Sequence, residues 1–223
     1  MNILSFDTAA NRMFVNISID GEIAASKIVD NTKNSYHTAF LIPVIIELLK
    51  KLDMTMHDMD GIGVNMGPGS FTGIRASATV ARIMAQQLNI PVVGISSLQI
   101  YSNLNNTSKD ALCLLDARKG MAYIAVYSQF GEEKIPPKAV YYAEALSIAQ
   151  NMDYFIISDA RMAEKLYQIG LKSLITDESQ ADMGVYLAEI TYNLLSEGDA
   201  EKYNWKKFKP LYIQPPPISM PKS

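Results

Sequence analysis

The residues best placed to do chemistry are two aspartates, each of which ends a short apolar stretch. Asp7 is followed by Thr8, and Asp116 is followed two positions later by Arg118. Carboxylates at strand ends can hold a metal ion beside nucleotide phosphates, and a hydroxyl can contact a phosphate oxygen. Aspartates in turns also serve only to accept bonds from turn amides, which is the commoner role. Asp7, Thr8, Asp116 and Arg118 therefore form a candidate nucleotide cleft in degenerate form.

A glycine-rich segment, Gly67-Pro68-Gly69-Ser70-Phe71-Thr72-Gly73-Ile74-Arg75, is the second candidate. Strand-like residues precede it and a small-residue stretch to Leu88 follows, which predicts a strand, a turn and a helix N-terminus. Such an N-terminus directs free amides toward an anion, and Ser70 or Thr72 can cap it. No lysine follows the last glycine, and the spacing is not a dinucleotide fingerprint. The signature turn, either a tight turn or a degenerate anion site, comprises Gly67, Gly69, Ser70, Phe71, Thr72 and Gly73.

Metal and nucleophile chemistry have little support. The two histidines, His37 and His57, do not lie one helical turn apart, so no metal site is predicted. Ser70 lacks the Gly-x-Ser-x-Gly elbow of a hydrolase. Cys113 lies in an apolar stretch, where burial blunts a thiol. No catalytic residue is assigned, and the hydrolase class ranks below an ATP-dependent phosphotransferase.

Composition favours a globular protein of the cytoplasm. The chain has 223 residues, 48% of them hydrophobic, a net charge of −3 and a single cysteine. We expect no membrane span, since no apolar run reaches about 18 residues. Its first residues lack the basic and apolar regions of a signal peptide, and one cysteine cannot form an internal disulfide.

The chain contains a degenerate repeat. In each copy an apolar strand ends in Asp7 or Asp116, a hairpin follows, and a second strand closes in a Gly-Glu turn. We predict an α/β fold of two similar subdomains, residues 1–102 and 103–213, with residues 214–223 as a proline-rich tail. Duplicated subdomains of this kind are typical of actin, sugar kinases and Hsp70 chaperones.

The helix predicted over residues 38–52 is apolar on nearly every side. One sheet needs a stripe of only about 100°, so the excess apolar surface predicts either a further layer or another subunit. The next helix carries a polar stripe at spacings of four and three. The predicted partner interface comprises Phe40, Leu41, Val44, Ile45, Leu48, Arg75, Thr79 and Arg82.

A basic and aromatic cluster lies near the C-terminus. Residues 202–209 read Lys-Tyr-Asn-Trp-Lys-Lys-Phe-Lys. Basic residues among aromatic ones can contact RNA. The alternative, which the acidic balance of the chain favours, is a segment anchored by its rings with lysines turned to water.

Residues 65–75 resemble the signature of the bacterial TsaB (YeaZ) family. Further matches are Leu4 to Thr8, Ile90 to Leu98 and Leu115 to Arg118. The resemblance implies an actin-like fold and a noncatalytic subunit for threonylcarbamoyladenosine formation in ANN-decoding tRNAs. It implies binding to a TsaD-type catalytic subunit, docking of a TsaE-type ATPase, a homodimer in isolation and tRNA contact through the complex. It implies no cofactor held by this chain alone, with ATP and Mg²⁺ acting at the level of the complex.

Overall fold

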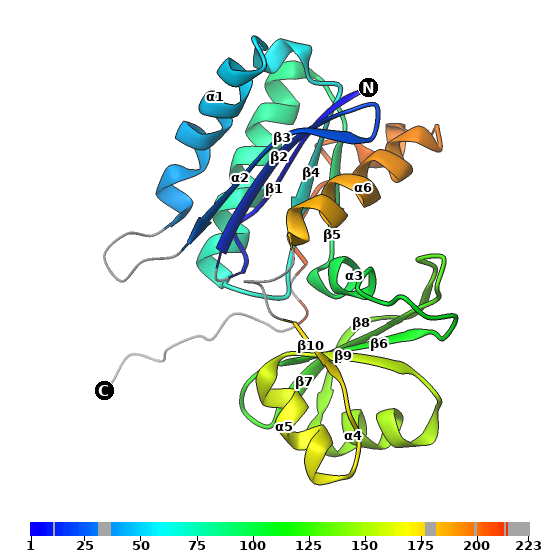
Figure 1. Cartoon of the computed structure of the whole chain (residues 1–223). Helices are drawn as coiled ribbons and strands as arrows, with labels where there is room; N and C mark the ends of the chain where they lie inside the picture. The colour runs from blue at the N-terminus through cyan, green and yellow to red at the C-terminus, as the bar shows by residue number, and fades with distance from the viewer. Residues whose placement is uncertain (11, 31–36, 177–181, 199, 212, 214–223) are drawn as a thin grey trace, which may run out of the picture.

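The computed structural model describes residues 1–10, 12–30, 37–176, 182–198, 200–211 and 213. Two five-stranded mixed sheets form two lobes (Figure 1). The first sheet comprises β1 (Asn2–Asp7), β2 (Arg12–Ile19), β3 (Glu22–Asp30), β4 (Gly61–Asn65) and β5 (Val92–Ile95). The second comprises β6 (Ala111–Asp116), β7 (Met121–Tyr127), β8 (Glu133–Tyr141), β9 (Phe155–Ser158) and β10 (Leu174–Ile175).

The helices occupy matching places in the two halves. The first half has α1 (Leu41–Lys51), α2 (Phe71–Leu88) and α3 (Ser97–Ser102), and the second has α4 (Tyr142–Asn151), α5 (Ala160–Gln168) and α6 (Met183–Ser196). Short 3-10 helices are η1 (His37–Phe40), η2 (Met56–Asp58) and η3 (Ala200–Tyr203). Each half therefore runs through three strands, then helix, strand, helix, strand and helix.

The sheet topology confirms the duplication predicted from the two aspartate-ended strands. The first sheet has the order β3-β2-β1-β4-β5, and the second has the equivalent order β8-β7-β6-β9-β10. In both sheets, the first three strands in sequence pair antiparallel. The fourth strand then pairs parallel with the first, and the fifth pairs parallel with the fourth. Asp7 and Asp116 end equivalent central strands.

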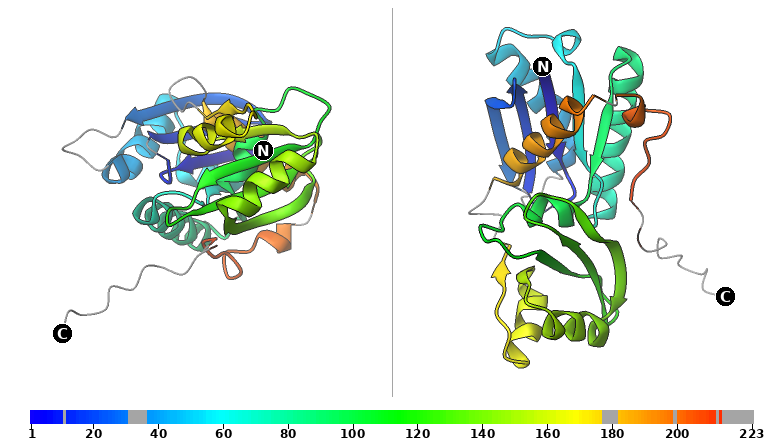
Figure 2. Two further views of the ribbon diagram at one scale, coloured as in Figure 1. Left: turned by 90° about the horizontal axis from the view of Figure 1, so that it is seen from below. Right: turned by 90° about the vertical axis from the view of Figure 1, so that its right-hand side faces the viewer.

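The last helix of each half crosses to the other lobe. Helix α3 contacts β6 and β7, whereas α6 contacts β1, β2, β4 and β5. Figure 1 shows α6 against the first sheet, on the side opposite α1 and α2, and the right-hand view in Figure 2 shows the same lobe above the second. The predicted second subdomain, 103–213, includes this returning part of the chain: from residue 182 to Phe208, the chain packs largely on the first lobe. The predicted tail, 214–223, lies outside the described residues.

Three layers of apolar side chains hold these elements together. One lies between the first sheet and helices α1 and α2, one around α3 and α6 between the lobes, and one between the second sheet and helices α4 and α5. Because burial of apolar surface is stabilising, by about 25 cal/mol per Å², the middle layer holds the two lobes together. Within the described residues, no helix is both long and apolar enough to cross a bilayer.

Candidate functional site

The signature turn packs backbone to backbone against the β1–β2 hairpin. The Ser70 amide donates to the Ala9 carbonyl oxygen at 2.7 Å, and the Thr8 hydroxyl donates to the Gly73 carbonyl oxygen at 2.7 Å. A Cβ atom at Gly69 would lie 2.6 Å from the Ala9 oxygen, and one at Gly73 would overlap the Thr8 oxygen. The turn thus lies directly against the β1–β2 hairpin and engages the Thr8 hydroxyl, the group that the sequence suggested for a phosphate contact.

Asp7 is buried in this packing, and its carboxylate is hydrogen-bonded by groups of the same chain. Its side chain is buried, with the residue 3% exposed, and its carboxylate accepts bonds from the Ala9 amide at 2.6 Å and from Asn65 Nδ2 at 2.8 Å. Asn65 Oδ1 in turn accepts from the Gly67 amide at 2.8 Å and from the Ser97 hydroxyl at 2.9 Å. The carboxylate orients the Asn65 amide, and the amide fixes the start of the turn. Sequence reasoning placed Asn65 beside the motif but missed this role; the signal available was a polar side chain at the end of an apolar strand, two residues before a glycine.

The two ends of the turn have different requirements. Gly67 has a φ of +93°, a conformation that favours glycine. Ser70 is the N-cap of α2, and its hydroxyl accepts from the Gly73 amide at 3.3 Å, which confirms the predicted cap. Gly69 and Gly73 do not have positive φ and are required by close contact instead. Thr72 is exposed and Phe71 half-buried at the first positions of α2.

The second hairpin holds its aspartate differently. Asp116 accepts bonds from the Tyr142 hydroxyl at 2.6 Å, from Arg161 at 2.7 Å and from the Arg118 amide at 3.0 Å. Burial acts to raise the pKa of Asp116, but these three hydrogen bonds outweigh it and hold the pKa below its ordinary value. Arg118 has a φ of +63° in the tight turn, and its side chain is exposed. The Asp116 carboxylate therefore has hydrogen-bond partners within the chain, the Arg161 guanidinium and the Tyr142 hydroxyl.

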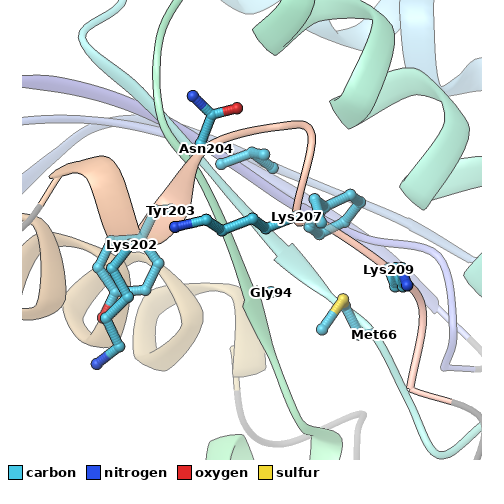
Figure 3. A pocket seen from close by; sticks show the side chains of 9 residues that line it. Met66, Gly94, Lys202, Tyr203, Asn204, Lys207 and Lys209 are labelled. Atoms are coloured by element: carbon cyan, nitrogen blue, oxygen red, sulfur yellow. The ribbon is translucent and has the colours of Figure 1, made fainter.

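The described residues offer few other groups for chemistry. Among the described residues, no three His, Cys, Asp or Glu side chains are grouped to hold a metal ion. Burial raises the pKa of the Cys113 thiol, which is fully buried, so it is a poor nucleophile. The pocket in Figure 3 is lined by none of the predicted nucleotide-cleft residues.

Helix α1 does not present the surface predicted from its sequence. Leu41, Val44, Ile45 and Leu48 are 1–4% exposed and belong to the core against the first sheet. Their assignment to a partner interface is wrong for this fold, because they face inward. Phe40 is 42% exposed, and the outer side of α1 carries Ile42 and Ile46, at 41% and 46%.

Helix α2 presents the predicted polar stripe to the surface. Arg75, Thr79 and Arg82 are exposed, and Ile83, which follows Arg82, is 54% exposed. The Arg75 guanidinium lies 4.4 Å from the centre of the Phe71 ring, one turn earlier, and the Arg82 guanidinium lies 6.0 Å from the Trp205 ring. Both arginines therefore sit over aromatic rings at the surface.

Comparison with known proteins identifies the family of this chain. The family model described as TsaD, tRNA N6-adenosine threonylcarbamoyltransferase, matches residues 24–214. A relative from Bacillus subtilis (strain 168), named tRNA threonylcarbamoyladenosine biosynthesis protein TsaB, is 29% identical over 81% of this chain and 82% of its own length. The chain belongs to this family, in its TsaB (YeaZ) branch. A TsaB protein from Escherichia coli (strain K12) is 29% identical over 58% of this chain and 56% of its own length.

Solved structures agree on the fold. YeaZ from Pseudomonas aeruginosa superposes with a TM-score of 0.72 at 21% identity, covering 91% of this chain and 97% of that one. A ROK family protein from Streptococcus pneumoniae TIGR4 superposes with a TM-score of 0.50 at 10% identity, covering 88% and 99%. With the matching sheet orders of the two lobes, these likenesses confirm the predicted actin-like duplicated fold.

Proposed function

We propose that this chain is a noncatalytic assembly subunit of the machinery that forms threonylcarbamoyladenosine in ANN-decoding tRNAs. It binds a TsaD-type catalytic subunit and activates it. The names of the TsaB relatives and the description of the matching family model support the pathway. The engagement of both hairpin aspartates by groups of the chain supports a role without chemistry of its own.

The observation that carries the proposal is a set of exposed apolar side chains on η1, α1 and α2, the helices that cover one side of the first sheet. We call Phe40, Ile42, Ile46 and Ile83 the apolar face; each is 41–54% exposed. Arg75, Thr79 and Arg82 are exposed on the same helix as Ile83. Apolar side chains rimmed by polar ones are typical of protein interfaces. The catalytic subunit therefore docks on this face.

The proposal extends to the oligomeric state, the ATPase and the nucleotide, which the resemblance to the TsaB family implies. In isolation the chain forms a homodimer through the apolar face, and a TsaE-type ATPase docks on the heterodimer in the cytoplasm. ATP and Mg²⁺ act at the level of the complex, because Asp7 is taken up by Asn65 and the Ala9 amide. Calorimetry of the isolated chain with ATP and Mg²⁺ separates the noncatalytic subunit from the phosphotransferase alternative. The phosphotransferase alternative requires that the chain bind ATP and that Asp7→Asn abolish this binding.

A double substitution tests the docking surface. Ile42→Glu with Ile46→Glu places two carboxylates on the apolar face without touching the core, so the chain is expected to stay folded and to lose association with the TsaD-type subunit at least a hundredfold. The matched control is Tyr167→Glu, at a side chain 75% exposed on α5 in the other lobe. Sedimentation of mixtures of the two proteins measures association. Unchanged association of a folded double variant contradicts the assignment.

A further inference from the structure

A basic pocket lies where the C-terminal segment passes the edge of the first sheet. Its volume is about 190 Å³, and β5 is the edge strand beneath it. In the view of Figure 3, Lys202 and Lys209 lie toward opposite ends of the pocket and Lys207 lies between them. The lining residues are Met66, Val92, Gly94, Lys202, Tyr203, Asn204, Lys207, Phe208 and Lys209.

Aromatic side chains anchor the segment and fix its shape. Phe208 is 6% exposed in the core of the first lobe, Trp205 packs against the same core, and Tyr203 packs against the layer between the lobes. Asn204 Oδ1 accepts from the Lys206 amide at 3.0 Å, which closes the turn between the rings. The rings are used for packing, so they do not form a platform for stacked bases.

The lysines of this segment are unpaired with carboxylates in the part of the chain that the structure describes. Lys202, Lys206, Lys207 and Lys209 are exposed, and among the described residues none forms an ion pair with a carboxylate. Lys207 Nζ donates only to the carbonyl oxygen of Glu201, at 3.4 Å. Four like charges within eight residues repel one another, in a chain whose net charge is −3.

We propose that this pocket and its lysines bind the phosphates of an RNA strand, which is the tRNA if the proposed function holds. Rows of lysines neutralise phosphates without reading bases, and no exposed ring is needed for that contact. A protein partner fits less well, because lysine is depleted at protein interfaces. A membrane surface fits less well, because the apolar side chains of the segment point into the core rather than outward.

Neutralising the pocket tests the proposal. In the full chain, Lys202, Lys207 and Lys209 are changed together to Gln. The control changes Lys51, Lys119 and Lys172 to Gln, which removes the same charge from exposed positions elsewhere. Fluorescence anisotropy with a labelled, unmodified ANN-decoding tRNA transcript measures binding to the chain alone and to its complex with the TsaD-type subunit. The pocket variant is expected to bind at least tenfold more weakly, and the slope of log K against log salt is expected to fall by about 2. The control stays near wild type.

Four other outcomes would contradict the proposal. Equal losses in both variants mean that only total charge matters, and no loss in the chain or the complex means that the pocket does not contact RNA. Competition with tRNA binding by inorganic phosphate, at concentrations where chloride of equal ionic strength does not compete, indicates a small-anion site instead. A pocket variant that keeps RNA binding but no longer associates with the TsaD-type subunit marks a protein-docking surface. Failure of the wild-type chain to associate at all contradicts the proposed function rather than this inference.

Discussion

At the residue scale, the two glycines of the signature turn are required by what lies beside them. Gly69 and Gly73 face the carbonyl oxygens of Ala9 and Thr8. A glycine-rich turn usually indicates backbone angles that favour glycine, but of the three glycines in this turn the structure shows such an angle only at Gly67. Close approach of a hairpin 60 residues away in sequence leaves no local signal, so the true reason could not be inferred from the chain alone.

Gly73→Ala tests this reason directly. The added methyl group overlaps the Thr8 oxygen, and backbone has little freedom to move, so the free energy of unfolding is expected to fall by about 3 kcal/mol or more. The control is Gly120→Ala, where φ is +78° but no atom lies within 4 Å of the added carbon; its expected loss is about 1 kcal/mol. Urea denaturation measures both. A smaller loss at Gly73 than at Gly120 contradicts the contact argument.

Asp116 gives stability a dependence on pH. Its folded pKa lies below the ordinary 3.8, so its stabilisation is complete above that value and is lost as pH falls through the folded pKa. Asp116→Asn is expected to cost about 1–2 kcal/mol at pH 6 and clearly less at pH 3. Urea denaturation at the two pH values measures the difference. A cost that does not shrink in acid would show that the ionised carboxylate is not what stabilises the hairpin.

At the element scale, α1 shows what an all-round apolar pattern cannot specify. The sequence predicts the helix and its excess apolar surface, but not which side faces the sheet, because nearly every position qualifies. The structure buries Leu41, Val44, Ile45 and Leu48 and exposes Ile42 and Ile46.

Strand β8 contains two adjacent prolines, so its sequence has no clear strand pattern. In the structure it forms an edge of the second sheet.

Ile45→Glu on the inner side of α1 is expected to behave unlike the outer substitutions. Ile45 is 1% exposed, so an unpaired carboxylate there costs several kcal/mol and the chain is expected to be largely unfolded. Circular dichroism compared with that of Ile46→Glu measures the difference. A folded Ile45→Glu chain with normal thermal stability would mean that the helix can turn its other side to the sheet.

At the scale of the whole molecule, the duplication was visible in the sequence but the crossing of the helices was not. Two aspartate-ended strands and their closing turns mark the repeat. The path of α6 depends on small residues: a Cβ atom at Gly61 or Gly63 would collide with Leu195 or Thr191 of that helix. Such contacts join segments more than 100 residues apart and carry no periodic signal, so the return of the chain to the first lobe at residue 182 could not be predicted from the sequence.

The central claim is that the chain assembles a complex and does no chemistry. Formation of threonylcarbamoyladenosine in an ANN-decoding tRNA transcript, reconstituted with the TsaD-type subunit, the TsaE-type ATPase and its substrates, tests it most directly. Wild-type chain and Asp116→Asn are expected to support modification within several-fold of each other, whereas the Ile42→Glu, Ile46→Glu chain is expected to support about a hundredfold less. A hundredfold loss with Asp116→Asn, together with normal activity of the doubly substituted chain, would contradict the account.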